Sequence, residues 1–174
     1  MEIVKYPREI LREKAKPIEK ISDSIFELAD SMISIMLENK GIGLAANQVG
    51  KLYRLFVINL NPFEDKPELL AVINPKIIDR EGMDVDEEGC LSFPGLYLNI
   101  PRAKKIRLHM QNLYNEKMVL DTEGIVARAI QHEIDHLDGV LFIDYVSEEE
   151  KPKLKRYLDD LKTMNNSNLK ANNL

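Results

Sequence analysis

The sequence predicts a single domain that combines α-helices with β-strands. Two segments, 24–40 and 123–138, carry apolar residues at the three- and four-residue spacing of an amphipathic helix. Segments 53–60 and 69–73 are rich in Val, Ile, Leu and Phe, as is typical of strands, and residues 105–110 alternate between apolar and polar side chains. A chain of 174 residues is long enough for one such domain with its own core.

The first helix has recognisable end signals. Ser24 and Glu27 have the spacing of a capping box, which predicts the helix start. Gly41 suits the position just past the last turn, because glycine accepts the left-handed backbone found there. Four apolar residues mark the face that we expect to be buried: Ile25, Leu28, Met32 and Met36.

Turn residues mark the ends of the predicted strands. Asn-Pro pairs at 61–62 and 74–75 follow the first two strands. Residues 117–120 are a plausible hairpin partner for 105–110, because only a short turn across 115–116 separates the two segments.

The second helix, 123–138, presents two neighbouring faces. One face anchors it in the core: Val126, Ile130, Ile134 and Leu137. The other can floor a cleft: Ile125, Ala129, His132 and His136. A third helix is predicted where apolar residues repeat again: Leu154, Tyr157, Leu158 and Leu161. Periodicity is lost after Thr163, so we expect a catalytic domain at 1–163 and a disordered tail at 164–174.

Composition narrows the class of protein. Hydrophobic residues make up 44% and charged residues 30%, with a formal net charge of −5, which is unlike the basic surface of most nucleic-acid-binding domains. No apolar run approaches the ~20 residues of a membrane-spanning helix, and no signal peptide is visible. We therefore expect a cytoplasmic protein with no membrane contact and no specific nucleic-acid binding. Cys90 is the only cysteine, so no disulfide forms within the chain.

Residues 131–136 read Gln-His-Glu-Ile-Asp-His and carry the strongest chemical signal. Histidines four apart on a helix lie on one face, where two neutral imidazoles can hold one metal ion. The intervening Glu133 can then act on a water molecule that the ion activates. The segment predicts a hydrolytic metal site on the second helix.

A catalytic site of this kind needs a third protein ligand and one open position. His109 lies on the polar side of its strand, so surface exposure is the simpler reading. Phe142 stands where a metzincin would carry its third histidine, and residues 148–150 lie at a solvated helix start. That leaves Cys90, whose glycine- and proline-flanked segment can approach a cation closely. Bound thiolates are good metal ligands.

A third segment, 41–50, is rich in small residues and contains one amide, Gln48. No strand precedes its Gly-x-Gly pair, so a dinucleotide site is not indicated. It is either a simple turn after the first helix or the lining of a narrow cleft.

Together these segments resemble peptide deformylase. The motifs GxGLAAxQ, EGCLS and QHExDH of that family stand at 41–48, 88–92 and 131–136, in the family's order. The likeness extends from about Tyr6 to Tyr145, and the compact length is similar to the bacterial form. It implies an α+β fold in which antiparallel sheets surround a central helix that bears HExDH, with an additional C-terminal helix.

The resemblance also implies a site and a reaction. A metal ion would be held by Cys90, His132 and His136, most often Fe²⁺, with Ni²⁺, Co²⁺ or Zn²⁺ as substitutes. The enzyme would remove the formyl group from N-formylmethionyl nascent peptides and release formate. Glu133 would move the proton, while Gln48 and the Leu91 backbone N–H stabilise the oxyanion.

Further roles follow from the resemblance by position. The methionine pocket would involve Ile42, Gly43, Ile125 and Ala129. Glu88 and Arg102 would form an ion pair that braces the Cys90 loop. The resemblance also implies N-formylmethionyl nascent peptides as partners, with the ribosome near the exit tunnel as a further expected partner, although the sequence does not give the affinity for ribosomes.

Some questions stay open at this level. Rival classes are a small zinc peptidase, a metal-stabilised binding module and an inactive homologue. The ion, the oligomeric state and the peptide preference beyond formylmethionine are not given by the residues. Arg128, Tyr97 and Asp135 have no assigned roles: an apolar residue is easier to explain at 128, and some relatives carry Arg at 97.

Overall fold

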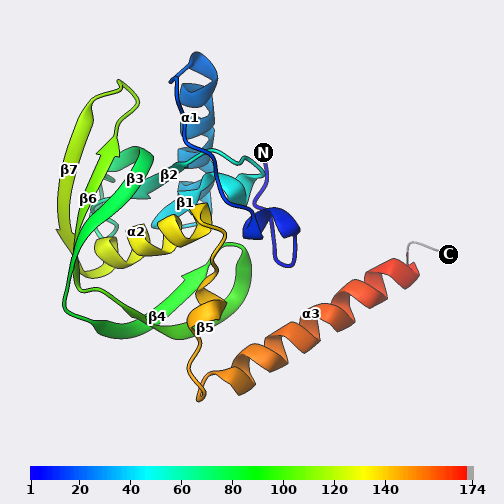
Figure 1. Ribbon diagram of the computed structural model, residues 1–174. Coiled ribbons are helices and arrows are strands. Elements are labelled where there is room, and N and C mark those ends of the chain that lie inside the picture. The colour runs from blue at the N-terminus through cyan, green and yellow to red at the C-terminus, as the bar shows by residue number, and fades with distance from the viewer. Residues whose placement is uncertain (172–174) are drawn as a thin grey trace.

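The computed structural model describes residues 1–171 and has an α+β fold, as the sequence predicts (Figure 1). Helices and strands follow in this order: 3₁₀ helix η1 (Glu9–Arg12), α1 (Asp23–Glu38), β1 (Gly43–Ala45), 3₁₀ helix η2 (Ala46–Val49), β2 (Leu55–Asn59), β3 (Leu69–Glu81), β4 (Asp84–Cys90), β5 (Phe93–Arg102), β6 (Lys105–Gln111), β7 (Lys117–Glu123), α2 (Gly124–Leu137), 3₁₀ helix η3 (Phe142–Tyr145) and α3 (Lys151–Ala171).

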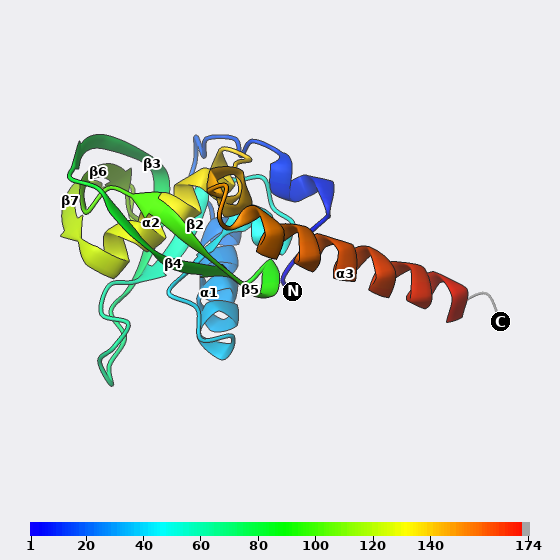
Figure 2. The ribbon, with the colours of Figure 1, turned by 90° about the horizontal axis from the view of Figure 1, so that it is seen from below.

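The strands form two antiparallel sheets. Five of them pair in the order β1-β2-β3-β6-β7, and β4 pairs with β5 in a separate hairpin. The predicted hairpin of β6 and β7 is confirmed, with its register running from Lys105 opposite Glu123 to Gln111 opposite Lys117. The larger sheet curves around α2, and the β4–β5 hairpin lies on the other side of that helix (Figures 1 and 2).

Strand β2 shows why two helices flank the larger sheet. All five of its residues are buried, and successive side chains point to opposite faces. Leu55 and Val57 pack into the cluster that contains α1, while Phe56 and Ile58 pack into the cluster that contains α2. The predicted core face of α2 is buried as expected, so this helix is fixed between sheet and hairpin.

The ends of α1 differ from the prediction. The helix is capped by Ser22, without a side-chain hydrogen bond, so Ser24 and Glu27 form no capping box. At the other end Lys40, not Gly41, has the positive φ of 55°. The Gly41 N–H donates to the Met36 carbonyl at 2.8 Å, which closes the helix in a Schellman arrangement.

The sheet is more extensive than the sequence suggests. The Asn-Pro pair at 74–75 does not end the second strand: Asn74 adopts φ 49° at a register shift, and β3 continues to Glu81. Strand β4 was not predicted, because its first four residues are exposed and three of them are acidic. Strand β5 does carry a period-two signal, with buried residues at 96, 98 and 100.

Helix α3 touches the body only near its start. Leu154 and Tyr157 pack against the hairpin cluster, and the helix then runs away from the domain (Figures 1 and 2). The structure continues this helix to Ala171 through part of the segment predicted as a disordered tail, and 172–174 lie outside the described residues. The boundary at 163 stays a prediction. None of the described helices is long and apolar enough to cross a membrane.

Candidate active site

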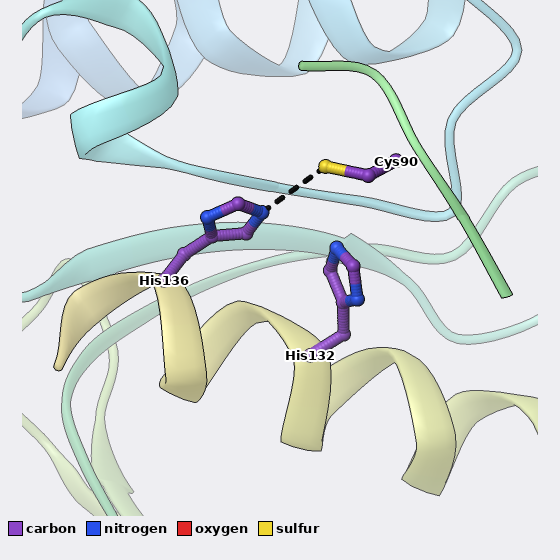
Figure 3. Close-up of side chains that lie close together, drawn as sticks. All are labelled: Cys90, His132 and His136. Carbon is purple, nitrogen blue, oxygen red and sulfur yellow. Dashed lines mark hydrogen bonds between the residues drawn. The ribbon is translucent and has the colours of Figure 1, made fainter. Parts of the chain in front are cut away.

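Helix α2 brings both motif histidines to one side, facing Cys90 at the end of β4 (Figure 3). The Cys90 Sγ lies 3.2 Å from His136 Nε2, and one ligand atom from each of the three residues lies within 4.8 Å of the others. A thiolate and two imidazoles suit a borderline-soft divalent cation and leave a position open. The donor set therefore fits a catalytic metal ion.

The other ligand candidates do not join this group. His109 is exposed on β6, as predicted. Glu148 and Glu149 are exposed, and Glu150 instead accepts a hydrogen bond from Asn99 at 2.6 Å. Among the described residues, Cys90 is thus the third donor that the geometry brings to the two histidines.

The orientation of His132 is set by Glu88. The His132 Nδ1 lies 3.0 Å from Glu88 Oε2, which leaves Nε2 for a metal ion. Burial alone would raise the pKa of Glu88, but hydrogen bonds from His132 and Arg102 lower it to about 2. Glu88 is therefore a fixed negative charge next to His132.

Two arginines and a second carboxylate complete this support. Arg102 donates to Glu88 from Nε at 2.8 Å and to Asp135 Oδ2, and the Tyr145 hydroxyl donates to the other Asp135 oxygen at 3.2 Å. Asp135 thus braces Arg102. The expected Glu88–Arg102 pair is present and almost fully buried.

Arg128 now has a structural explanation. Its guanidinium donates to Glu88 Oε1 at 3.0 Å and to the carbonyl oxygens of Ile100 at 2.7 Å and Asp84 at 3.2 Å. These acceptors lie on both strands of the β4–β5 hairpin. Arg128 therefore ties α2 to the hairpin that carries Cys90, a role that an apolar residue could not perform.

Glu133 stands in a different environment. Its carboxylate is buried, and the Oε2 atom has no hydrogen-bond partner among the described residues. Burial raises the pKa of Glu133 to about 7. A Cβ atom at Gly43 would lie 2.6 Å from Glu133 Oε1, so only glycine lets the β1 backbone approach this closely. The carboxylate is poised to exchange a proton near neutral pH.

The Gln48 side chain is held at both of its polar atoms. Its Oε1 accepts from the Ala45 N–H at 2.8 Å, so its Nε2 must face Cys90. That nitrogen lies 3.5 Å from Cys90 Sγ and 3.2 Å from Ser92 Oγ. The small-residue segment therefore lines the site, and the simple-turn reading of it is wrong.

A cavity of about 640 Å³ opens in front of these groups. It is lined by every residue predicted for the methionine pocket: Ile42, Gly43, Ile125 and Ala129. Tyr97 lies at its rim, about half exposed, and its ring packs against Gly89, where a Cβ would meet it at 2.7 Å. Tyr97 therefore forms part of the cavity wall where some relatives have Arg.

Some supporting residues were not found from the sequence. Gln131 donates to the Ala103 carbonyl and accepts from its N–H, each at 3.0 Å, which fixes α2 to the end of β5. Asn47 donates to the His136 carbonyl at 2.5 Å. Both lie inside recognised motifs, but their partners are backbone groups distant in sequence, which a motif does not reveal.

The fold and the donor set define a metal-dependent hydrolase built on an HExxH helix. Comparison with known proteins is more specific. The polypeptide deformylase profile matches residues 1–152. The peptide deformylase of Alkalilimnicola ehrlichii is 44% identical over 161 residues, covering 92% of this chain and 90% of that protein, and that of Acidobacterium capsulatum is 48% identical over 145 residues, covering 83% and 85%.

Solved structures agree. Arabidopsis thaliana peptide deformylase 1B in complex with an inhibitor superposes with a TM-score of 0.90 at 34% identity, covering 97% of this chain and 93% of that one. The Thermotoga maritima enzyme gives 0.78 at 41% identity, covering 84% and 97%. The chain belongs to the polypeptide deformylase family, whose reaction removes the N-formyl group from newly synthesised polypeptides and releases formate.

Proposed function

We propose that Cys90, His132 and His136 hold the catalytic metal ion and that Glu133 is the base of the deformylation reaction. The observation that carries this assignment is the Glu133 Oε2 atom, which is buried near the three converging donors and has no hydrogen-bond partner within the described part of the chain. A buried carboxylate oxygen left unpaired is costly unless a substrate or water completes it. The pKa of Glu133, raised to about 7 by burial, suits a group that takes and returns a proton.

A divalent cation held by Cys90, His132 and His136 would supply Lewis-acid activation of a water molecule and of the formyl carbonyl. Glu133 Oε2 accepts the proton of the attacking water and later delivers it to the amine of methionine as the formyl C–N bond breaks. Formate and the free α-amine are the products.

We assign oxyanion stabilisation to the Gln48 side-chain amide and the Leu91 backbone N–H. The Gln48 Oε1 is already engaged by Ala45, so its Nε2 is presented to the reacting carbonyl without a search over side-chain conformers. Preorganised donors of this kind are each worth about 10²–10³ in rate. Leu91 follows Cys90 directly, so its N–H adjoins the same ligand.

The methionine side chain is proposed to enter the cavity against Ile42, Ile125 and Ala129. These residues are partly buried and apolar, which matches an unbranched thioether. The Gly43 backbone would pair with the peptide as an added strand at the edge of β1. Preference beyond methionine is then set near Tyr97.

For the ion, we propose Fe²⁺, with Ni²⁺, Co²⁺ or Zn²⁺ as substitutes. Mixed sulfur and nitrogen donors suit all four ions, so the choice rests on the family resemblance. Protein prepared anaerobically and reconstituted with each ion in turn should differ in turnover, with iron among the active forms. A Zn²⁺ form much faster than the Fe²⁺ form would contradict this assignment.

The direct test is formate release from a formyl-Met peptide by the iron-loaded protein, with an unformylated internal peptide as the comparison substrate. We expect formate from the first and no cleavage of the second. Cleavage of internal peptide bonds without formate would favour the zinc-peptidase alternative.

We further propose that the protein acts in the cytoplasm and associates with ribosomes near the exit tunnel, where its substrate emerges. Support comes from Lys155 and Arg156 near the start of the projecting helix α3, where the other two cations, Lys151 and Lys153, pair with Glu148 and Glu150. Contacts of this type with RNA phosphates weaken steeply as salt rises. Co-sedimentation with ribosomes that is lost with salt and in a Lys155→Glu/Arg156→Glu variant would support it, whereas sedimentation unchanged by both would not.

A further inference from the structure

Residues 4–6 cross the two turns that carry the proposed oxyanion donors. The Val4 N–H donates to the Gln48 carbonyl at 2.7 Å, and the Tyr6 N–H donates to the Ser92 carbonyl at 3.0 Å. Between them, Lys5 Nζ donates to the Leu91 carbonyl at 2.5 Å. Three consecutive residues thus bond to two segments that are distant in sequence. Gln48 in one segment and Ser92 in the other are 44 positions apart and are themselves hydrogen-bonded.

The spacing of these donors is physically restrictive. In an extended segment the N–H groups of residues i and i+2 point to the same side, about 7 Å apart. Val4 and Tyr6 are only two residues apart and bond to Gln48 and Ser92, so their N–H groups hold the η2 turn and the β4–β5 turn close together. The Tyr6 ring stacks on Phe93 with centroids 4.8 Å apart and an interplanar angle of 24°, which stops the segment from sliding.

We propose that segment 4–6 is a positioning strap that sets the distance between the Gln48 amide and the Leu91 N–H. The inference rests on the proposed oxyanion roles of those two groups. The hydrogen bonds that the strap donates go to main-chain oxygens beside the proposed ligand Cys90 and not to the ligand atoms themselves. The strap acts through the backbone carbonyls of Gln48, Leu91 and Ser92, and so determines where the two donors point when charge develops on the formyl oxygen.

Lys5 offers the clearest sign of this role. Its side chain is exposed at the cavity edge, where a lysine would ordinarily remain hydrated, yet its ammonium group is bonded to a main-chain oxygen of the catalytic turn. The alternative is that Lys5 contacts the peptide substrate itself. The two roles differ in kinetics, because a substrate contact changes KM whereas a misplaced oxyanion donor changes kcat.

Matched pairs of variants test the strap. Val4→Pro removes the N–H that bonds Gln48, while Val4→Ala keeps it and loses only packing. Lys5→Met removes the bond to Leu91, while Lys5→Arg keeps a donor, and Lys51→Met removes a lysine outside the cavity. We expect Val4→Pro and Lys5→Met to lower kcat about tenfold, since small misplacements of catalytic groups are costly. KM, metal content and melting temperature should stay near those of the paired controls.

The decisive measurement is a double-mutant cycle with Gln48→Ala. If the strap acts through Gln48, Val4→Pro lowers kcat in the wild-type background but has little further effect once the amide is gone. Equal effects in both backgrounds would overturn the proposal, as would a rise in KM alone for Lys5→Met, or unchanged kcat in both strap variants.

The same double-mutant cycle distinguishes the strap proposal from the oxyanion assignment of Gln48 and Leu91 on which it rests. A slow Gln48→Ala enzyme with fully active strap variants would refute the strap and leave the oxyanion assignment standing. A fully active Gln48→Ala enzyme would refute both.

Discussion

Glu88 and Glu133 are two buried carboxylates that both interact with His132, but their hydrogen bonding is opposite. Glu88 accepts hydrogen bonds from Arg102, Arg128 and His132, so both of its oxygens are engaged. Glu133 has one oxygen without a partner among the described residues. Their pKa values move apart accordingly, to about 2 for Glu88 and to about 7 for Glu133.

This contrast distinguishes a carboxylate that positions a neighbouring side chain, Glu88, from one that can react, Glu133. A carboxylate whose hydrogen bonds are complete can hold a neighbour in place but has no capacity left for a reacting proton. A carboxylate that is buried and incompletely bonded costs stability in the resting protein and is free to react. Removing each in turn should therefore damage different properties.

The largest effect is expected for Glu133→Gln. Loss of the base should lower kcat by about 10²–10⁴ while the three metal ligands remain, because the substitution keeps the size of the side chain. Steady-state kinetics and metal content measured on the same preparation check this. Asp138→Asn, at the end of the same helix, is the control for loss of a carboxylate. Near-wild-type kcat in Glu133→Gln would refute its role as base.

The metal-free protein should show opposite pH dependences for the two sites. The folded-state pKa of Glu133 is raised to about 7, so its contribution to stability is present below pH 4.5 and is lost as pH rises through 7. Glu133→Gln should thus be more stable than the wild type at pH 8, by roughly 3 kcal/mol. Urea unfolding between pH 4 and 8 measures the difference, which should vanish near pH 4.

The contribution of Glu88 to stability has the opposite pH dependence. Its lowered pKa of about 2 means that its contribution is present above pH 4.5 and is lost as pH falls toward 2. Glu88→Gln should therefore be destabilised at neutral pH and should approach the wild type in acid. If both variants shifted stability in the same direction at pH 8, the distinction between the two carboxylates would fail.

A smaller effect is expected on metal binding. Glu88→Gln weakens the hold on His132 Nδ1, and loss of such a partner typically lowers metal affinity about 10–100-fold. Competition with a chelator gives the dissociation constant. The enzyme should recover turnover at saturating metal, which Glu133→Gln cannot do at any metal concentration.

The smallest effect should come from Arg128→Met. Arg102 still pairs with Glu88 in this variant, so metal affinity should fall by less than in Glu88→Gln, within about tenfold. The hairpin carbonyls that Arg128 bonds would lose their donor, so the melting temperature should also fall. A loss of metal affinity larger than that of Glu88→Gln would show that Arg128, not Arg102, is the main partner.

The motif residues of α2 and the supporting contacts to the β4–β5 hairpin also differed in how far the sequence could predict them. His132 and His136 follow from helix periodicity, and Glu133 from its place between them, because a local repeat carries that information. The role of Arg128 could not be predicted, since most of its partners are main-chain carbonyls on β4 and β5. Strand β4 itself escaped notice because exposed acidic residues give no apolar alternation.

The same reasoning applies to the fold. The face of α1 was predicted because its buried residues recur every three or four positions, and β3 was underestimated because an Asn-Pro pair ordinarily ends a strand. In the structure the Asn74 side chain accepts from the Ile18 N–H at 2.9 Å, and the strand resumes beyond it. A tertiary contact with a distant segment overrides the local turn signal there.

The ion pair between Arg12 and Asp144 joins positions 132 residues apart, and the strap at 4–6 bonds to residues as distant as Ser92. Contacts of such high sequence separation form late, because the closure of long loops must precede them. The last proposed metal ligand, His136, is synthesised well after the strap. The proposed catalytic centre and the Arg12–Asp144 ion pair are therefore complete only after residue 144 has been synthesised, so a polypeptide arrested before that point would carry the start of an active site and no activity.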